Sequence, residues 1–174
     1  MHLKIKMLLI TIFILGGSFF GYQFYKSVSR KQNSQQQIAT LLDFKFETLK
    51  GKSFSKKDLS KNKKKLFIHF NSDCDICQNE ALKFSEKIQD LKEYQILYIS
   101  YESPKNIDSF SRKFGLDQIS NITFLRDVNT VFYSWVESHQ VPYILAYDEN
   151  DKLVYQHKGM TIFSKLIESL ENGH

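Results

Sequence analysis

The chain contains two cysteines, Cys74 and Cys77, which are separated by Asp75 and Ile76. Two cysteines three positions apart in the first turn of a helix lie on the same side of it, so their sulfur atoms can come within disulfide distance. Unpaired backbone N–H groups and the dipole at a helix N-terminus favour a thiolate, the species that attacks a disulfide. This pattern predicts thiol-disulfide exchange, with Cys74 as the nucleophile and Cys77 as the resolving cysteine.

Other uses of a cysteine pair fit this chain less well. A purely structural disulfide between Cys74 and Cys77 would close a very small loop and restrain the unfolded chain little. The chain has no further cysteine, so it offers no partner for a four-cysteine zinc site. Among the histidines, His69 falls inside an apolar strand and His157 ends a surface hairpin, whereas His139 lies in a predicted loop. The alternative function is therefore a copper metallochaperone that uses Cys74, Cys77 and His139.

The predicted secondary structure positions the cysteine pair between a buried strand and a helix. Residues 65–70 (KLFIHF) are typical of a buried strand, and residues 76–91 carry apolar side chains at mostly helical spacing. Further strands are predicted over residues 44–48, 95–101, 122–125, 143–147 and 153–157, a helical turn over 56–59, and helices over 104–114, 128–138 and 162–170. This order predicts an α/β fold: a three-layer sandwich with a central mixed sheet covered by helices on both faces.

Val141 and Pro142 are the second candidate feature, directly before the predicted strand 143–147. A proline that opens a strand after a loop is ordinary. A cis X-Pro bond beside the cysteines would instead place backbone groups against the reactive sulfur and against an incoming peptide. The residues alone leave both interpretations open.

Residues 7–25 (MLLITIFILGGSFFGYQFY) are apolar except for Thr, Ser and Gln. A helix of this length spans the roughly 30 Å hydrocarbon core of a bilayer, so we predict a transmembrane anchor after a short N-terminal segment, residues 1–6. A cleaved signal peptide would have a shorter apolar core and a clearer cleavage site. Residues 26–40, rich in Gln and Ser, are expected to form a polar tether, and residues 41–174 the domain.

The net charge of +5 does not indicate nucleic-acid binding. Residues 1–43 hold five Lys or Arg and one acid, Asp43, which leaves 19 basic and 18 acidic side chains in the rest of the chain. Positive charge is concentrated locally in one run of lysines: Lys61, Lys63, Lys64 and Lys65. We interpret this run as a solvated turn before a strand. Apolar residues make up 42 % of the chain, with 15 Phe and 9 Tyr, which indicates one domain with a substantial core and a sheet.

These features together resemble the TlpA/ResA-like, membrane-anchored branch of the thioredoxin superfamily. The similarity runs from about Phe44 to Leu170, through the stretches FETLKGKSFSKKDL, KKLFIHFNSDCDICQNE and VPYILAYDENDKLVYQHKG. The resemblance implies a thioredoxin-like fold with an additional helix and strand, supplied here by residues 104–125, and a cis Pro142. It also implies a role for Glu80, which matches an acidic position near the active-site cavity in that branch.

The chain departs from that branch around the first cysteine. Such proteins commonly carry Trp before the first cysteine and Pro between the two, where this chain has Asp73 and Asp75-Ile76. Two carboxylates beside Cys74 disfavour its thiolate by like-charge repulsion, which opposes the helix dipole. A less stable thiolate goes with a more reducing couple, so we expect a disulfide reductase. A peroxidase is less consistent with the sequence, because Asn71 stands where peroxiredoxin-like proteins carry threonine.

The expected partners follow from this chemistry, which needs no cofactor. They are protein disulfide substrates and a membrane or periplasmic thiol-disulfide electron donor that reduces the oxidised pair again. A single-pass anchor and a redox domain suit the oxidising side of a bacterial inner membrane, so we expect the domain to face the periplasm. Membrane lipid would be contacted through residues 7–25, and nucleic acid is not an expected partner.

Overall fold

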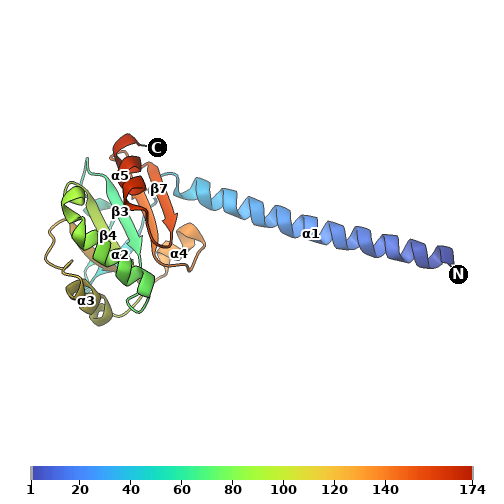
Figure 1. The fold of residues 1–174 in the computed structure, drawn as a ribbon, viewed down its shortest axis with the longest axis horizontal. Coiled ribbons are helices and arrows are strands. Elements are labelled where there is room, and N and C mark those ends of the chain that lie inside the picture. The colour runs from blue at the N-terminus through green and yellow to red at the C-terminus, as the bar shows by residue number, and fades with distance from the viewer. Residues whose placement is uncertain (1, 174) are drawn as a thin grey trace. The chain divides into compact units, whose positions relative to one another are not determined.

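The computed structural model describes the backbone of residues 2–173 and the side chains of residues 15–29 and 35–173. Residues up to Gln36 form one unit, most of the helix α1 (His2–Ile38), and residues from Gln37 onward form a compact domain. With η marking a short 3₁₀ helix, the domain contains β1 (Lys45–Thr48), β2 (Ser53–Ser55), η1 (Lys56–Asp58), β3 (Lys65–His69), α2 (Asp75–Glu86), η2 (Ile88–Leu91), β4 (Gln95–Ser100), α3 (Pro104–Lys113), β5 (Ile122–Arg126), α4 (Val131–Val136), β6 (Tyr143–Tyr147), β7 (Leu153–Lys158) and α5 (Phe163–Asn172) (Figure 1).

Seven strands form one mixed sheet in the order β2-β1-β5-β4-β3-β6-β7. The three central strands β5, β4 and β3 run parallel to one another, and the other pairings are antiparallel. β3 and β6 are buried along their whole length, which explains why their sequences are nearly continuous apolar runs. The additional helix and strand expected within residues 104–125 are α3 and β5, and β5 joins β4 to β1.

Helices cover both faces of the sheet, as predicted. α2, α3 and α5 pack on one face, where Phe84 and Leu166 belong to the larger core, while α4 packs on the other face through Trp135. Successive strand residues point to opposite faces, so β3 contributes Ile68 to the first core and Phe67 to the second. Figure 1 shows α2 lying in front of β3 and β4.

The predicted helix over residues 128–138 is shorter than expected. α4 comprises only Val131–Val136, because Thr130 and Glu137 on either side of it adopt left-handed backbone conformations, with φ of 52° and 47°. Thr130 is the N-cap residue of α4, but the first N–H groups of the helix are bound by Asp127. Its carboxylate accepts hydrogen bonds from the N–H groups of Val131 and Phe132, each at 2.8 Å.

Two further differences concern the start of the domain and the helix after the cysteines. Strand β2 was not predicted, and its three residues pair with β1 at the edge of the sheet. The predicted helix over residues 76–91 ends at Glu86, and a separate 3₁₀ turn, η2, follows Lys87.

The segment expected to be a polar tether is helical up to Ile38, and the domain begins earlier than Leu41. Ile38 is buried, and its carbonyl accepts a hydrogen bond from the Tyr147 hydroxyl at 3.2 Å. Thr40 forms an isolated antiparallel bridge with Lys152. These contacts attach residues 38–41 to the β6–β7 hairpin.

The predicted membrane anchor, residues 7–25, falls partly on side chains that the structure does not describe, those of residues 7–14. Within the described part of the chain, no helix is long and apolar enough to cross a bilayer. The described residues of this segment include several exposed large apolar side chains: Leu15, Phe19, Phe20, Tyr22, Phe24 and Tyr25.

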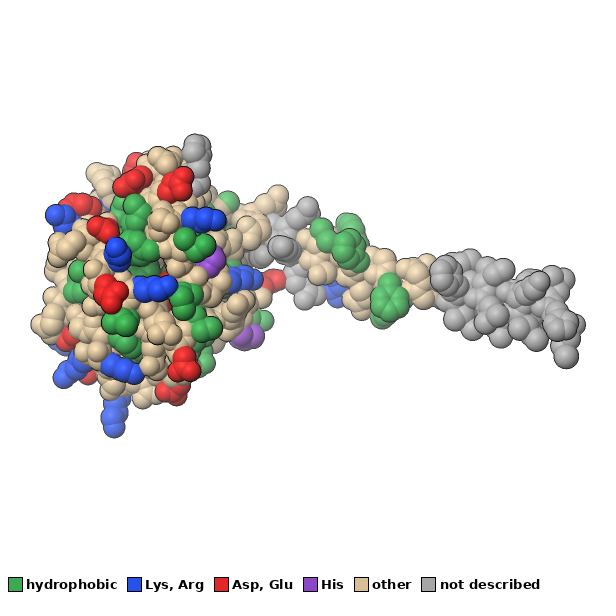
Figure 2. Space-filling view, in the orientation of Figure 1, with side chains coloured by type: hydrophobic (Ala, Val, Ile, Leu, Met, Phe, Trp, Pro, Cys, Tyr) green, Lys and Arg blue, Asp and Glu red, His purple; other side chains and the backbone are tan. Residues whose placement is uncertain are grey.

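The lysine run before β3 is only partly solvated, which differs from the expectation. Lys65 is buried and pairs with Asp151 at 2.7 Å, and the Lys64 ammonium donates to the Leu170 carbonyl. Two of the four lysines therefore have structural partners. Figure 2 shows acidic and basic side chains interspersed on the visible face of the domain, without a field of one sign.

Candidate active site

Cys74 is the N-cap residue of α2, as the sequence predicted. Its Sγ accepts a hydrogen bond from the Cys77 N–H at 3.2 Å, and its carbonyl accepts one from the Gln78 N–H at 3.0 Å. Both thiols are free; Cys74 is half-buried, whereas Cys77 is only 2 % exposed. The Cys74 sulfur is therefore the more accessible of the two, and the Cys77 thiol lies behind it in the core.

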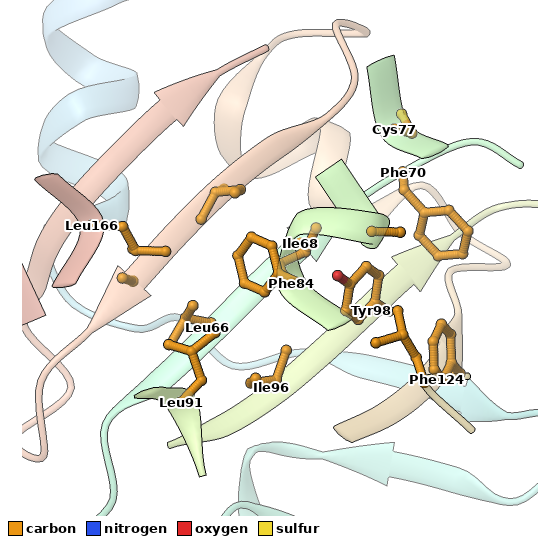
Figure 3. Packing of buried hydrophobic residues seen from close by; sticks show 14 of the residues in the cluster. Leu66, Ile68, Phe70, Cys77, Phe84, Leu91, Ile96, Tyr98, Phe124 and Leu166 are labelled. Atoms are coloured by element: carbon orange, nitrogen blue, oxygen red, sulfur yellow. The ribbon is translucent and has the colours of Figure 1, made fainter. Parts of the chain in front are cut away.

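Cys77 lies at the edge of the larger core, close to Phe70 (Figure 3). Burial raises its pKa well above the ordinary value; a backbone hydrogen bond involving Asn71 partly opposes this, and the neighbouring Cys74 and Glu80 raise the pKa further. At neutral pH Cys77 is therefore a protonated thiol. Its attack on a mixed disulfide needs a group that takes the proton.

Glu80 lies one turn further along α2 from Cys77. It is 1 % exposed, and both carboxylate oxygens accept from the Thr161 N–H, at 3.2 and 3.0 Å. Its charge raises the pKa of Cys77, so the carboxylate acts on the thiol electrostatically. Glu80 is thus a buried acid beside the cysteine pair and not an ordinary exposed helix residue.

Val141 and Pro142 lie opposite the cysteine pair. The Val141–Pro142 bond is cis, as the family resemblance implied. The Cys74 Sγ lies 3.9 Å from the Val141 carbonyl oxygen, within hydrogen-bonding distance for a thiol donor, and the Pro142 carbonyl is held by the Gly159 N–H at 2.8 Å. The loop before β6 therefore brings a backbone acceptor to the reactive sulfur.

Asp73 and Asp75 flank Cys74 in the sequence, and both are exposed. The Asp73 N–H donates to the Asn71 Oδ1 at 2.9 Å, and Asp75 lies in the first turn of α2. No ion pair involves either carboxylate among the described residues. Their repulsion of a Cys74 thiolate is therefore open to screening by solvent and salt.

The loop that carries Cys74 is held by residues whose role was not predicted from the sequence. Glu102, just after β4, accepts from the Ser72 N–H and the Ser72 hydroxyl, both at 2.7 Å. The Ser72 carbonyl accepts from the Gln78 side chain at 2.8 Å, and Gln78 in turn accepts from Lys113 of α3 at 2.7 Å. The only sign of this role in the sequence is that Glu102 is acidic and lies between the end of a predicted strand and Pro104, which opens a helix.

The structure does not bring His139 together with the cysteines. Among the described residues, no three His, Cys, Asp or Glu side chains are grouped so that they could hold a metal ion. His139 stacks on Tyr133 instead, with ring centroids 4.0 Å apart. His69 is a core residue, as expected: it stacks on Phe132, and burial, with a smaller contribution from His139, lowers its pKa to about 4.

Comparisons with known proteins agree with this architecture. The sequence pattern of the AhpC/TSA family matches residues 39–162, and no curated protein sequence matches the chain. Among solved structures, a secreted Mycobacterium tuberculosis disulfide oxidoreductase, described as homologous to DsbE of E. coli, is 18 % identical with a TM-score of 0.61, covering 79 % of this chain and 98 % of that one. The exposed lipoprotein thioredoxin of Streptococcus pneumoniae is 20 % identical with a TM-score of 0.60, covering 75 % of this chain and 99 % of that one. The thiol peroxidase of Chromobacterium violaceum is 14 % identical with a TM-score of 0.64, covering 77 % of this chain and 85 % of that one.

At these identities the three structures establish a shared thioredoxin-like fold, and the family assignment rests on the sequence match. That match spans the domain from the residues before β1 to the end of the loop before α5, and it contains the cysteine pair and the loop that faces it. The chain belongs to the AhpC/TSA family, as a thioredoxin-like thiol-disulfide oxidoreductase that carries the CxxC pair Cys74 and Cys77.

Proposed function

We propose that the protein is a disulfide reductase for polypeptides outside the cytoplasm. The Cys74 thiolate attacks one sulfur of a substrate disulfide, forms a mixed disulfide and releases the first substrate thiolate. The Cys77 thiolate then attacks the Cys74 sulfur, which releases the second substrate thiolate and leaves a Cys74–Cys77 disulfide. Two electrons pass to the substrate. The observation that carries this assignment is the half-buried Cys74 sulfur at the N-terminus of α2 with the buried Cys77 behind it.

In this scheme Glu80 takes the proton from Cys77 during the second step. The pKa of Cys77 is raised, so the thiol requires a base, and Glu80 is a buried carboxylate on the same face of α2. The Thr161 N–H holds the carboxylate in place. Glu80 is therefore the residue in the best position to make Cys77 nucleophilic.

The direction of electron flow is proposed from the residues around Cys74. Asp73 and Asp75 place two negative charges next to the sulfur that must carry the thiolate, and this favours a reducing couple. Other features, the buried Glu80 and the cis Val141–Pro142 bond, support a place in the TlpA/ResA-like branch, with protein disulfides as substrates. A thiol-disulfide donor in the membrane or the periplasm would then restore the two thiols.

The location is proposed from the N-terminal sequence. Residues 7–25 are apolar over a length that suits a bilayer, and a disulfide reductase has its substrates on the oxidising side of a bacterial inner membrane. We therefore place the domain on the periplasmic side of the inner membrane, anchored by this segment.

The assigned roles are tested by trapping. Cys77→Ser keeps the attacking sulfur, so it should accumulate mixed disulfides with model protein disulfides, whereas Cys74→Ser should neither trap nor reduce them. Wild-type protein should reduce the disulfides of insulin with dithiothreitol as the electron source. Equal trapping by both variants would remove the roles given to the two cysteines.

A further inference from the structure

A cavity of about 260 Å³ opens at the edge of the sheet where β3, β4 and β5 end. Its lining residues come from five places in the chain: His69, Tyr101, Asp127, Thr130, Tyr133 and His139. His69 and Asp127 are only 5 % and 1 % exposed and form the deep part, while Tyr101, Tyr133 and His139 are exposed. The cavity therefore has a buried floor and an accessible rim.

Two of the rim residues connect the cavity to the reactive sulfur. The Tyr101 hydroxyl accepts from the Asn71 side chain at 3.2 Å, and the Asn71 carbonyl accepts from the Cys74 N–H at 3.3 Å. His139 lies two residues before Val141, whose carbonyl faces the Cys74 sulfur at 3.9 Å. The mouth of the cavity is therefore joined to the backbone on two sides of the reactive sulfur.

The lining is mostly aromatic, and its one carboxylate is bound by backbone groups. Both oxygens of the Asp127 carboxylate are used by the Val131 and Phe132 N–H groups, and the Thr130 hydroxyl donates to the Asn129 carbonyl. His69 is uncharged at neutral pH because burial lowers its pKa to about 4. An apolar cavity of about 150 Å³ is enough to bind benzene, so an aromatic ring has room here.

His69 also supplies an unsatisfied polar atom. Its Nδ1 is buried and has no hydrogen-bond partner among the described residues. Buried polar groups normally have partners, so an unpartnered atom on a residue that lines the cavity is a candidate for a partner supplied by a ligand. A phenol hydroxyl can serve as donor or acceptor to a neutral imidazole, which makes a tyrosine side chain the best match.

We propose that this cavity binds an aromatic side chain, tyrosine above all, of the polypeptide that carries the disulfide under attack. The inference rests on the proposed function and names its substrate class: disulfides with an aromatic residue close to one of the cysteines. In this proposal the ring packs against the stacked pair of Tyr133 and His139, and its hydroxyl is offered to His69, which lines the same cavity. Offset or edge-to-face contacts with several rings favour an aromatic side chain over an aliphatic one of similar size.

The test uses disulfide-linked peptides of one sequence in which a single tyrosine is moved through the three positions on either side of the cysteine. Peptides with Ala, Glu or Lys at the same positions serve as references. With the full chain, at least one tyrosine position should lower KM by about tenfold relative to Ala, with little change in kcat. Equal KM values for Tyr, Ala, Glu and Lys at every position would overturn the proposal.

A variant separates the cavity from the active site. Tyr133→Ala removes one exposed wall and should abolish the preference for the tyrosine peptide, while Tyr133→Phe should keep most of it. Leu82→Ala, which shortens an exposed apolar side chain on α2, is the matched control and should keep the preference. Retention of the full preference in Tyr133→Ala would also refute the cavity as its source.

A small disulfide without side chains, bis(2-hydroxyethyl) disulfide, separates the reductase activity from the role of the cavity. Wild type and Tyr133→Ala should reduce this compound at the same rate, because it has no aromatic group to place in the cavity. Failure of the wild-type chain to reduce any disulfide would refute the proposed function, whereas reduction of all peptides alike would refute only the cavity's role.

Discussion

Glu102 binds Ser72 twice, accepting from its backbone N–H and from its hydroxyl, both at 2.7 Å. The same carboxylate accepts from the Ser100 hydroxyl at 3.1 Å and lies 3.4 Å from the Asn106 side-chain amide. One side chain thus joins the end of β4, the start of α3 and the loop that leads into Cys74. We interpret Glu102 as a positioning residue: it does not touch the reacting sulfur, but it fixes the backbone two residues before it.

Replacement of Glu102 by Ala should lower both stability and activity. The Ser72 N–H and hydroxyl would lose their acceptor, which costs roughly 1–3 kcal/mol for a buried group, and kcat/KM for a disulfide peptide should fall by about tenfold as the loop loosens. Glu102→Gln should restore most of both, since an amide can accept from the N–H and donate to the hydroxyl oxygen. A stability loss without any change in kcat/KM would show that Glu102 supports only the fold.

Glu80→Gln should slow the resolving step and leave the first attack unchanged. The amide keeps an acceptor for the Thr161 N–H but cannot take a proton from Cys77, so release of the substrate from Cys74 should slow by about 10- to 100-fold. Mixed disulfides should accumulate in rapid acid-quench experiments. The first step, measured in the Cys77→Ser background with and without Glu80→Gln, should keep its rate.

The opposite result for Glu80 has a clear meaning. Its negative charge also contributes to the raised pKa of Cys77, so removing the charge makes the thiol easier to ionise. Faster resolution in Glu80→Gln would show that this electrostatic effect outweighs proton transfer, and Glu80 would then be a brake rather than a base.

His69 should make the domain lose stability as the pH falls below neutral. In the unfolded chain an ordinary histidine binds a proton near pH 6.5, whereas in the folded domain burial lowers the pKa of His69 to about 4. Between these two pH values the unfolded state binds more protons than the folded state, so the free energy of unfolding rises with pH. The stabilising contribution of the neutral His69 is fully present above about pH 6.5. The contribution amounts to up to about 3 kcal/mol.

Denaturant unfolding at pH 4.5 and pH 7.5 measures this effect. His69→Phe keeps an aromatic ring against Phe132 and cannot be protonated, so its stability should change less between the two pH values than that of the wild type. The same pH dependence in both proteins would assign it to other groups, such as Asp151, whose pKa is lowered by hydrogen bonds to Lys65 and Lys56 despite partial burial.

Membrane attachment is expected to depend on the N-terminal apolar segment. The full-length protein should stay with the membrane fraction through a high-salt wash, since salt weakens charge contacts but not an apolar span. A chain that starts at Gln35 keeps Ile38 and its bond with Tyr147, so it should fold and leave the membrane fraction. Release of the full-length protein by salt alone would point to peripheral binding or to cleavage.

The sequence was most informative where local chemistry decides the structure. The periodicity of apolar residues predicts most of the sheet and places Cys74 at the start of a helix, because strands and caps depend on neighbouring residues. The length of α4 could not be predicted in the same way, since the left-handed conformations of Thr130 and Glu137 have no strong signal in those residue types.

Contacts between distant segments account for what was missed at the site. Glu102 lies 30 residues from Ser72, and the cavity assembles residues that follow three different strands. Their proximity follows from the strand order, which places β4 beside β3 and β5 beside β4. Pattern alone indicates that these strands exist but does not fix which loop side chains meet at the ends of the sheet.

The acidic neighbours of Cys74 should set a reducing poise that weakens with salt. Asp73 and Asp75 are both exposed, so their repulsion acts largely through solvent and is reduced at high ionic strength. Replacing both by Asn removes this repulsion and stabilises the reduced pair with its Cys74 thiolate. The reduction potential of the double variant should therefore rise by up to about 30 mV at low salt, which is about tenfold in the exchange equilibrium constant.

Equilibration of wild type and the Asp73→Asn, Asp75→Asn variant with a glutathione redox buffer measures both potentials, at 20 mM and at 500 mM salt. The difference should be largest at low salt and should shrink at high salt, because the Debye length falls to a few ångströms as the ionic strength approaches about 1 M. A matched variant, Asp117→Asn, removes an exposed charge beyond α3 and should leave the potential unchanged. An unchanged or lower potential in the double variant would mean that the two acids do not set the redox poise, and the direction of electron flow would then be decided by the substrates.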